Sequence, residues 1–197
     1  MKYLTLFIIL ASLLSTTRAQ GGLKYKGSGY YWTKDGEKVK GDFKISYKTH
    51  LVGGSIIKHY VNGKKVGRVD IANLQSLIIN QDSFIVGHNF TLDSWASYDF
   101  DILEVSETGK IDLYIHRRKV KQGSGPNSIP IGYLTYSFVI SNDKGKTFKG
   151  IATKKQFEEY FIPMISANKK LLERIQAMKK REWLDNLPFL IQDYNNS

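Results

Sequence analysis

The chain has 197 residues and no cysteine, and its 29 lysine and arginine residues exceed its 18 aspartate and glutamate residues, for a formal net charge of +11 at pH 7. The lack of cysteine excludes disulfide bonds, cysteine-based metal sites and a thiol nucleophile. A basic surface favours anionic partners, but lysine occurs along the whole chain, and solubility alone is the explanation that we favour.

The first 19 residues have the pattern of a signal peptide. Lys2 provides a short positive region, Tyr3–Leu14 is apolar, and the small residues Thr17 and Ala19 precede a cleavage site. The apolar stretch is short for a membrane span, which favours cleavage over an uncleaved anchor. We therefore expect an exported protein, periplasmic, on the cell surface or secreted, with a mature chain that starts at Gln20 and has no transmembrane span.

Residues 20–150 contain short alternating runs separated by turn signals, which predict an antiparallel β-rich part. Asp35-Gly36 and Asn62-Gly63 are the strongest signals, because both central residues of a type I′ turn need positive φ. Odd positions in residues 38–47 are apolar or glycine and even positions are polar, so one face of that strand belongs to the core. Residues 30–32 are aromatic and consecutive, and we expect core or edge packing for them. The expected strands are Tyr30–Thr33, Lys38–Tyr47, Ser55–Tyr60, Lys65–Asp70, Leu74–Ile79, Ser83–Phe90, Tyr98–Glu107, Lys110–Arg118 and Ile131–Ser141.

Residues 151–197 predict a helical segment. A capping box from Thr153 to Gln156 starts the first helix, which Pro163 should end or kink. Asn168 can cap a second helix that reaches about Arg181. Asp185 or Asn186 can cap a third short helix, with Pro188 early in it. These helices have too little apolar surface to form a domain alone, so we expect them to pack on the β part. The predicted fold class is α+β in one domain: an antiparallel sheet, sandwich or open barrel with a C-terminal helical segment.

The stretches GYYWTKDGEKVKGDFKISY, DFDILEVSETGKIDLYIHRR and FEEYF, with DYNN near the C-terminus, resemble those of uncharacterised secreted proteins of Bacteroidota. The resemblance covers most of the mature chain. It implies an exported, envelope-associated protein without a known activity, and it brings no catalytic residues. A mature chain of this length can bury a sufficient core without disulfides, which fits a bacterial envelope protein.

Few residues suggest catalysis or metal binding. None of the four histidines has metal-site spacing, and each is expected to be an ordinary surface or edge residue: His50, His59, His88 and His116. Asp99 and Asp101 alternate with apolar residues, which places both carboxylates on one strand face. They could bind a cation or act as acid and base, but a solvated face explains them better. We expect no metal and no cofactor.

The strongest site candidate is the stretch HRRKVK, residues 116–121. Arg117, Arg118, Lys119 and Lys121 suit phosphate, sulfate or carboxylate. Charges on both faces indicate that this strand leaves the core as an exposed edge or arm. Protection of an edge strand by charge is the competing explanation, and the one we favour.

The predicted function is therefore non-enzymatic binding or structural work at the cell envelope. A polyanion or an envelope component is the candidate partner, and a nucleic acid is not expected. The alternative is a hydrolase or other enzyme in which only the fold brings a histidine and carboxylates together. A histidine and an acid that converge in a pocket would favour the enzyme, whereas a groove or a basic or aromatic patch would favour the binding protein.

Overall fold

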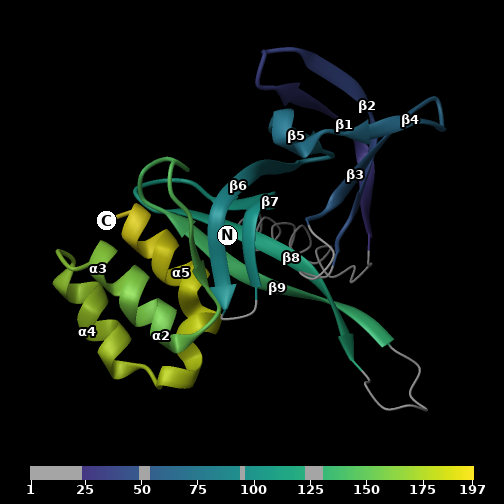
Figure 1. The fold of residues 1–197 in the computed structure, drawn as a ribbon. Helices are drawn as coiled ribbons and strands as arrows, with labels where there is room; N and C mark the ends of the chain where they lie inside the picture. Colours follow the sequence, from purple (N-terminus) through teal and green to yellow (C-terminus); the bar gives the residue numbers. More distant parts are fainter. Residues whose placement is uncertain (1–23, 49–53, 94–95, 123–130) are drawn as a thin grey trace, which may run out of the picture.

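The computed structural model describes residues 24–48, 54–93, 96–122 and 131–197 (Figure 1). The predicted signal peptide and residues 123–130 lie outside these residues. The described chain forms ten antiparallel strands followed by a helical segment, which confirms the predicted α+β class with an open sheet. None of its helices is long and apolar enough to cross a membrane.

All ten strands belong to one sheet with the order β10-β9-β8-β7-β6-β5-β1-β2-β3-β4. Because β1 lies between β2 and β5, the first four strands form one end of the sheet and β8–β10 form the other. The strands are β1 (Lys24–Thr33), β2 (Lys38–Ser46), β3 (Ile56–Val61), β4 (Lys64–Val69), β5 (Leu74–Ile79), β6 (Asp82–Asp93), β7 (Ala96–Glu107), β8 (Asp112–Gln122), β9 (Ile131–Ser141) and β10 (Lys149–Ile151).

The alternation in β2 and the predicted turn at Asn62-Gly63 are confirmed, whereas at Asp35-Gly36 only the glycine has a positive φ, so that turn is not of type I′. Asn62 and Gly63, between β3 and β4, have φ values of 51° and 74°, as a type I′ turn requires. On the core side of β2, Phe43 and Ile45 are buried. Gly41 of β2 leaves room for the His59 ring of β3, since a Cβ there would lie 2.3 Å from the ring nitrogen Nε2.

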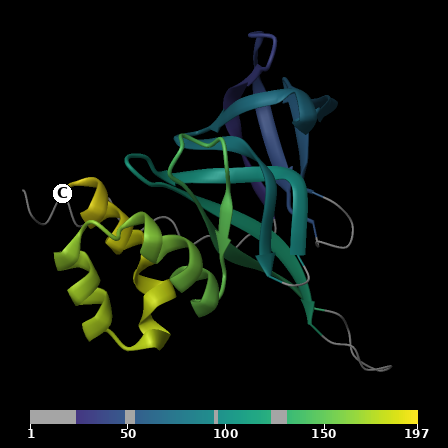
Figure 2. The same ribbon diagram turned by 60° about the vertical axis from the view of Figure 1, so that its left-hand side comes forward.

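The sheet is strongly curled (Figure 2). The backbone N–H of Lys119 in β8 donates a hydrogen bond to the carbonyl of Lys48, just beyond β2, at 3.1 Å. The backbone just after β2 therefore meets β8, although these two strands are far apart in the sheet order. The curl encloses a core of apolar residues from β2 to β7: Phe43, Ile45, Tyr47, Ile57, Val69, Ile71, Leu74, Leu77, Ile79, Phe84, Val86 and Ile102.

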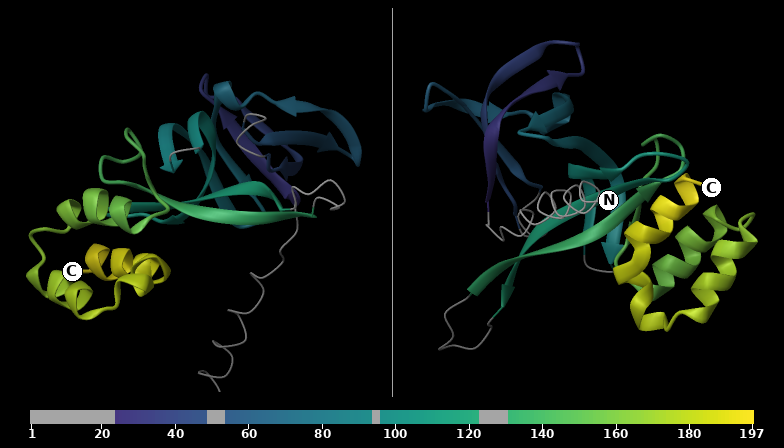
Figure 3. Two further views of the ribbon diagram at one scale, coloured as in Figure 1. Left: turned by 60° about the horizontal axis from the view of Figure 1, so that its bottom comes forward. Right: turned by 180° about the vertical axis from the view of Figure 1, so that it is seen from behind.

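The helical segment lies at the end of the sheet opposite to β1–β4 (Figure 3). Its elements are α2 (Lys154–Gln156), the π-helical η3 (Phe157–Phe161), α3 (Ile162–Met164), α4 (Lys169–Ala177), the 3₁₀ turn η4 (Lys180–Glu182) and α5 (Trp183–Asn195). One buried cluster joins sheet and helices: Ile111, Leu113, Ile140, Ile151, Phe157, Phe161, Ile165, Leu171, Ile175, Trp183, Leu187, Leu190 and Ile191.

The first two predicted helix caps are confirmed. The Thr153 side chain accepts a hydrogen bond from the Gln156 backbone, and the Gln156 side chain accepts one from the Thr153 backbone. The Asn168 side chain caps α4. Pro163 stands one residue before the end of α3, after a π-helical turn. A wider turn accommodates a residue that has no N–H to donate and whose ring crowds the preceding turn.

The predicted boundaries of the last two helices are wrong. The second helix, α4, ends at Ala177 rather than near Arg181. The third, α5, begins at Trp183, so Asp185 and Asn186 lie inside it and neither is its cap. Trp183 is buried, and its ring stacks on Phe157 with the centroids 5.0 Å apart. The start of α5 therefore coincides with a contact to a residue far away in the sequence. The capping residues alone do not predict this start.

Candidate functional site

The two arginines of the predicted anion site have carboxylate partners within the molecule. Arg117 Nε lies 2.9 Å from Glu104 Oε2, and Arg118 Nη2 lies 3.0 Å from Asp93 Oδ2. Both pairs are partly buried. An external anion at this place would compete with these carboxylates for the guanidinium groups.

The two lysines of that site lie farther along β8. Lys119 is half-buried, and the side chain of Lys121 lies outside the described residues. β8 pairs with β9 as far as Gln122 opposite Ile131, so this stretch is one strand of a long hairpin. The hairpin extends away from the helices (Figure 1).

His116 is fully buried, so the expectation of a surface or edge histidine is wrong for this residue. Its Nε2 lies 2.9 Å from Asp101 Oδ2, and the two side chains are 0% and 3% exposed. The other carboxylate oxygen accepts hydrogen bonds from the backbone N–H groups of Ser55 and Ile102, both at 2.8 Å. Asp101 therefore connects β7 to β8 and to the chain that enters β3.

Asp99 and Asp101 do not share a solvated face, contrary to the interpretation of their spacing. Asp101 is 2% exposed, whereas Asp99 and the adjacent Phe100 are both exposed. The alternation fails in β7 itself, where Asp101 and Ile102 are both buried, and the neighbouring strand β6 is distorted at Asn89, which has a φ of 51°. Positive φ at a non-glycine residue marks such a local distortion.

Several buried polar atoms near this pair have no hydrogen-bond partner among the described residues. They are His116 Nδ1, Arg118 Nε, Ser55 Oγ and the hydroxyls of Tyr47 and Tyr98. The Tyr98 and His116 ring centroids are 4.5 Å apart. Burial, and then the nearby Asp101 carboxylate, raises the pKa of Tyr98 to about 12.

The buried pair has the hydrogen-bond distance of an acid–base pair but is closed to substrate. A general acid or base must approach the proton that it transfers, and the side chains of His116 and Asp101 are 0% and 3% exposed. Within the described part of the chain, no three histidine, aspartate or glutamate side chains are grouped as metal ligands. The arrangement thus connects strands of the curled sheet.

The positive charge is concentrated in the first four strands, so our interpretation of an even spread is wrong. Residues 24–69 contain eleven lysine and arginine residues and three acidic ones, a net charge of +8. Residues 70–197 contain sixteen basic and fifteen acidic residues, a net charge of +1. The β1–β4 end of the sheet is therefore the basic part of the molecule.

Cross-strand register places four basic residues side by side, and we call them the basic row. Lys26 of β1 is opposite Lys44 of β2, which is opposite Lys58 of β3, which is opposite Arg68 of β4. Directly opposed residues share a face of the sheet. Since neighbouring strands are about 4.8 Å apart, the row extends roughly 14 Å across four strands.

The basic row lies on the outer face of β1–β4. Lys44 and Lys58 alternate with the buried residues Phe43, Ile45 and Ile57 on the opposite face. No residue of the row has an ion-pair partner among the described residues.

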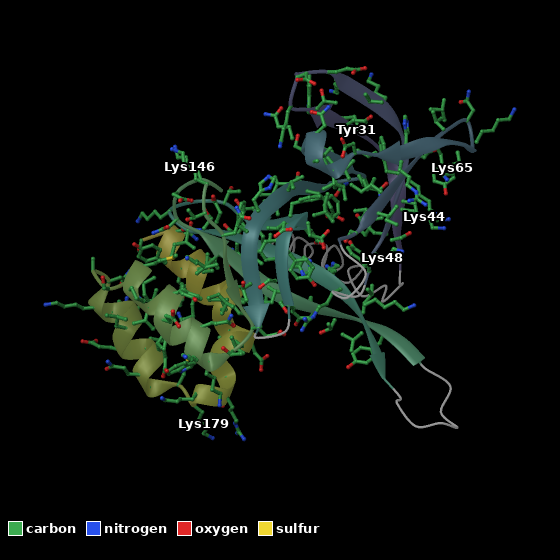
Figure 4. All side chains as sticks on the ribbon, in the orientation of Figure 1. Tyr31, Lys44, Lys48, Lys65, Lys146 and Lys179 are labelled. Atoms are coloured by element: carbon green, nitrogen blue, oxygen red, sulfur yellow. The ribbon has the colours of Figure 1, made fainter. Side chains whose placement is uncertain are left out.

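Figure 4 labels lysines at both ends of the molecule. Lys44 and Lys65 lie at the β1–β4 end, whereas Lys146 and Lys179 lie toward the helical end. This separation makes Lys146 and Lys179 suitable positions for control substitutions.

Aromatic residues lie farther along the same outer face. The Lys38 ammonium lies 3.7 Å from the centre of the Tyr30 ring and 5.2 Å from that of Trp32. Tyr30 and Trp32 lie four and six residues after Lys26 on the same strand. Because side chains alternate between the two faces, these even spacings place both on the face of the basic row. Trp32 is 36% exposed. The expectation of core packing therefore applies to Tyr31, which points to the other face and packs against the core.

A surface hollow of about 380 Å³ lies between α4 and the C-terminus. Arg174 and Asp193 line it and form an ion pair with each other. The hollow lies outside the predicted anion site, and apart from this ion pair its one charged lining side chain is Lys170.

The fold and these surfaces define a cysteine-free α+β protein with one strongly basic sheet face. No protein family, curated protein or solved structure matches the chain. The resemblance to secreted proteins of Bacteroidota therefore stays a prediction.

Proposed function

We propose that this is an exported, envelope-associated protein that binds an anionic partner without catalysing a reaction, and that the outer face of β1–β4 is the contact surface. The observation that carries the proposal is the basic row. Like charges directly opposite each other on neighbouring strands destabilise a sheet. An anionic partner would neutralise the row and offset this cost.

Edge protection explains only part of the row. β4 is an edge strand, and charge on an edge hinders pairing with other chains. This reason covers Arg68, but Lys26 and Lys44 lie on strands that have neighbours on both sides. Solubility does not require the charges to be adjacent. Binding accounts for all four residues.

The enzyme alternative depends on His116 and Asp101, which do meet within hydrogen-bond distance. Both are enclosed, whereas Lys26 and Arg68 of the basic row are exposed. The geometry therefore favours binding over catalysis.

The test compares charge removal at two ends of the molecule. The first variant replaces the basic row (K26Q, K44Q, K58Q and R68Q), and the control removes four lysines elsewhere (K146Q, K155Q, K169Q and K179Q). Retention of the mature protein on an immobilised sulfated polysaccharide is measured at low and at physiological salt. We expect the row variant to lose most of its retention, the control to lose little, and rising salt to weaken the parent.

Equal losses in the two variants would show that only net charge matters, and absence of retention of the parent would refute binding of this polyanion. A third variant, K119Q with K121Q, tests the site predicted on β8. It spares Arg117 and Arg118, because removing either would leave a partly buried carboxylate without its partner. If this variant loses more retention than the row variant, the contact surface lies on β8.

A further inference from the structure

We infer that the basic row binds a linear acidic polysaccharide with about one carboxylate per sugar, and that the polymer lies across β1–β4 rather than along a strand. This inference rests on the proposed function. It deepens that function by naming the ligand class and its direction on the sheet.

The direction follows from the charges on the outer face. Across the strands, Lys26, Lys44, Lys58 and Arg68 are adjacent and all positive. Along β2, the next residue on the same face is Asp42, which is exposed and accepts a hydrogen bond from the Ser28 hydroxyl. A polyanion that followed β2 would reach Lys40 and Lys38 only after it had passed this carboxylate, whereas the path across the strands meets four cations with no acid between them.

The polymer class follows from the spacing and kind of the cations. One sugar of an extended polysaccharide is about as long as the distance between neighbouring strands, so a carboxylate on each sugar meets one cation of the row. Three of the four cations are lysines, which act as point charges on flexible stems and, unlike arginine, do not need an anion that accepts two parallel hydrogen bonds. The row contains no aromatic ring on which a nucleic-acid base could stack.

A compact polyanion fits the row less well than a linear one. To reach a compact ligand, the four side chains would have to converge from a row roughly 14 Å long. Convergence brings like charges together and restricts long, flexible side chains. Affinity should therefore depend on the length of the ligand and not only on its charge.

The experiment measures binding of size-defined oligogalacturonates, from one to eight sugars, by titration calorimetry. We expect affinity to rise with length until about four sugars and then to level off, with the tetramer at least about tenfold tighter than the dimer, because each added contact is intramolecular. The row variant should lose this gain. Fully methyl-esterified oligomers, which carry no charge, should not bind.

Shortening the row provides a sharper test. K26Q and R68Q each remove one end of the row, so affinity should level off about one sugar earlier in either variant. W32A is the control, because Trp32 lies roughly 20 Å along β1 from Lys26 and a polymer across the strands does not reach it. A loss in W32A as large as that in K26Q would overturn the direction.

Two further ligands separate this inference from the proposed function. If inositol hexakisphosphate or an oligothymidylate binds through the row as tightly as the galacturonate octamer, the ligand class is wrong and the proposed function stands. If no tested anion depends on the row, the inference and the proposed function both fail.

Discussion

His116 Nε2 lies 2.9 Å from Asp101 Oδ2, and this contact joins β8 to β7 just beyond the place where their backbone pairing ends. That pairing ends with Glu104 opposite Ile115. A buried side-chain pair thus continues a connection that the backbone does not make. Because Asp101 also accepts the N–H of Ser55, it connects three separate segments of the curled sheet.

We expect Asp101→Ala to destabilise the protein strongly. Loss of one partner of a buried pair costs roughly 3–5 kcal/mol, and here the Ser55 N–H also loses its acceptor. Urea unfolding of the mature protein measures the change. Asp99→Ala is the control, because Asp99 is exposed, and it should change stability by less than about 0.5 kcal/mol. Similar losses in both variants would show that Asp101 does not connect the sheet.

One amide near the end of the C-terminal helix bonds to both backbone groups of Ile111, in the turn between β7 and β8. Asn195 accepts the N–H of Ile111 and donates to its carbonyl, each at 2.9 Å. Asn195→Ala leaves both backbone groups without this partner, at a cost of about 1–3 kcal/mol. The adjacent Asn196→Ala, at an exposed position, should have little effect. Equal unfolding midpoints for parent and Asn195→Ala would contradict this role.

Two residues of α5 offer a matched pair for the helix–sheet core. Leu187 is fully buried, and Phe189 is 61% exposed. We expect Leu187→Ala to lower the free energy of unfolding by about 2–5 kcal/mol, through lost burial and a cavity. Phe189→Ala should lower it by less than about 0.5 kcal/mol. The prediction is wrong if thermal melts rank the two variants in the reverse order.

Tyr98 predicts a loss of stability at alkaline pH. Burial raises its pKa to about 12 in the folded protein, against about 10 when unfolded. Since the fold favours the neutral hydroxyl, its stabilisation is complete below pH 10 and is lost as pH rises from 10 through 12. Urea unfolding of the parent and of Tyr98→Phe between pH 8 and 12 checks this. The effects of the other titrating groups cancel in the difference between the two free energies of unfolding. The parent should lose stability relative to the variant above pH 10, and a difference that does not vary with pH would exclude the effect.

The basic row should cost stability in the absence of a ligand. Lys44 is opposite a lysine on each neighbouring strand, so Lys44→Gln should raise stability by about 0.2–1 kcal/mol at low salt. Salt should reduce this gain. Lys40→Gln removes the same charge from the same strand, where the residue in register on β1 is Tyr30, and should give a smaller gain. An equal gain in both variants would mean that net charge, not the row, sets the cost.

Local features of this fold could be predicted from the sequence. The Asn62-Gly63 turn, the alternation in β2 and the capping box at Thr153 depend on residues within a few positions of one another. Such short-range preferences act wherever the segment lies in the fold. The excess charge of residues 24–69 was also visible in the sequence, but counting charge over the whole chain hid it.

The two most informative arrangements depend on tertiary structure. His116 and Asp101 are fifteen residues apart and meet because β7 and β8 are neighbouring strands of the folded sheet. The basic row joins residues of four strands, and a shift of one residue in any pairing would move its members to the core face. Register results from the packing of the whole apolar face of the sheet. The sequence by itself determined which residues are charged, whereas the folded sheet decided which of these residues are neighbours.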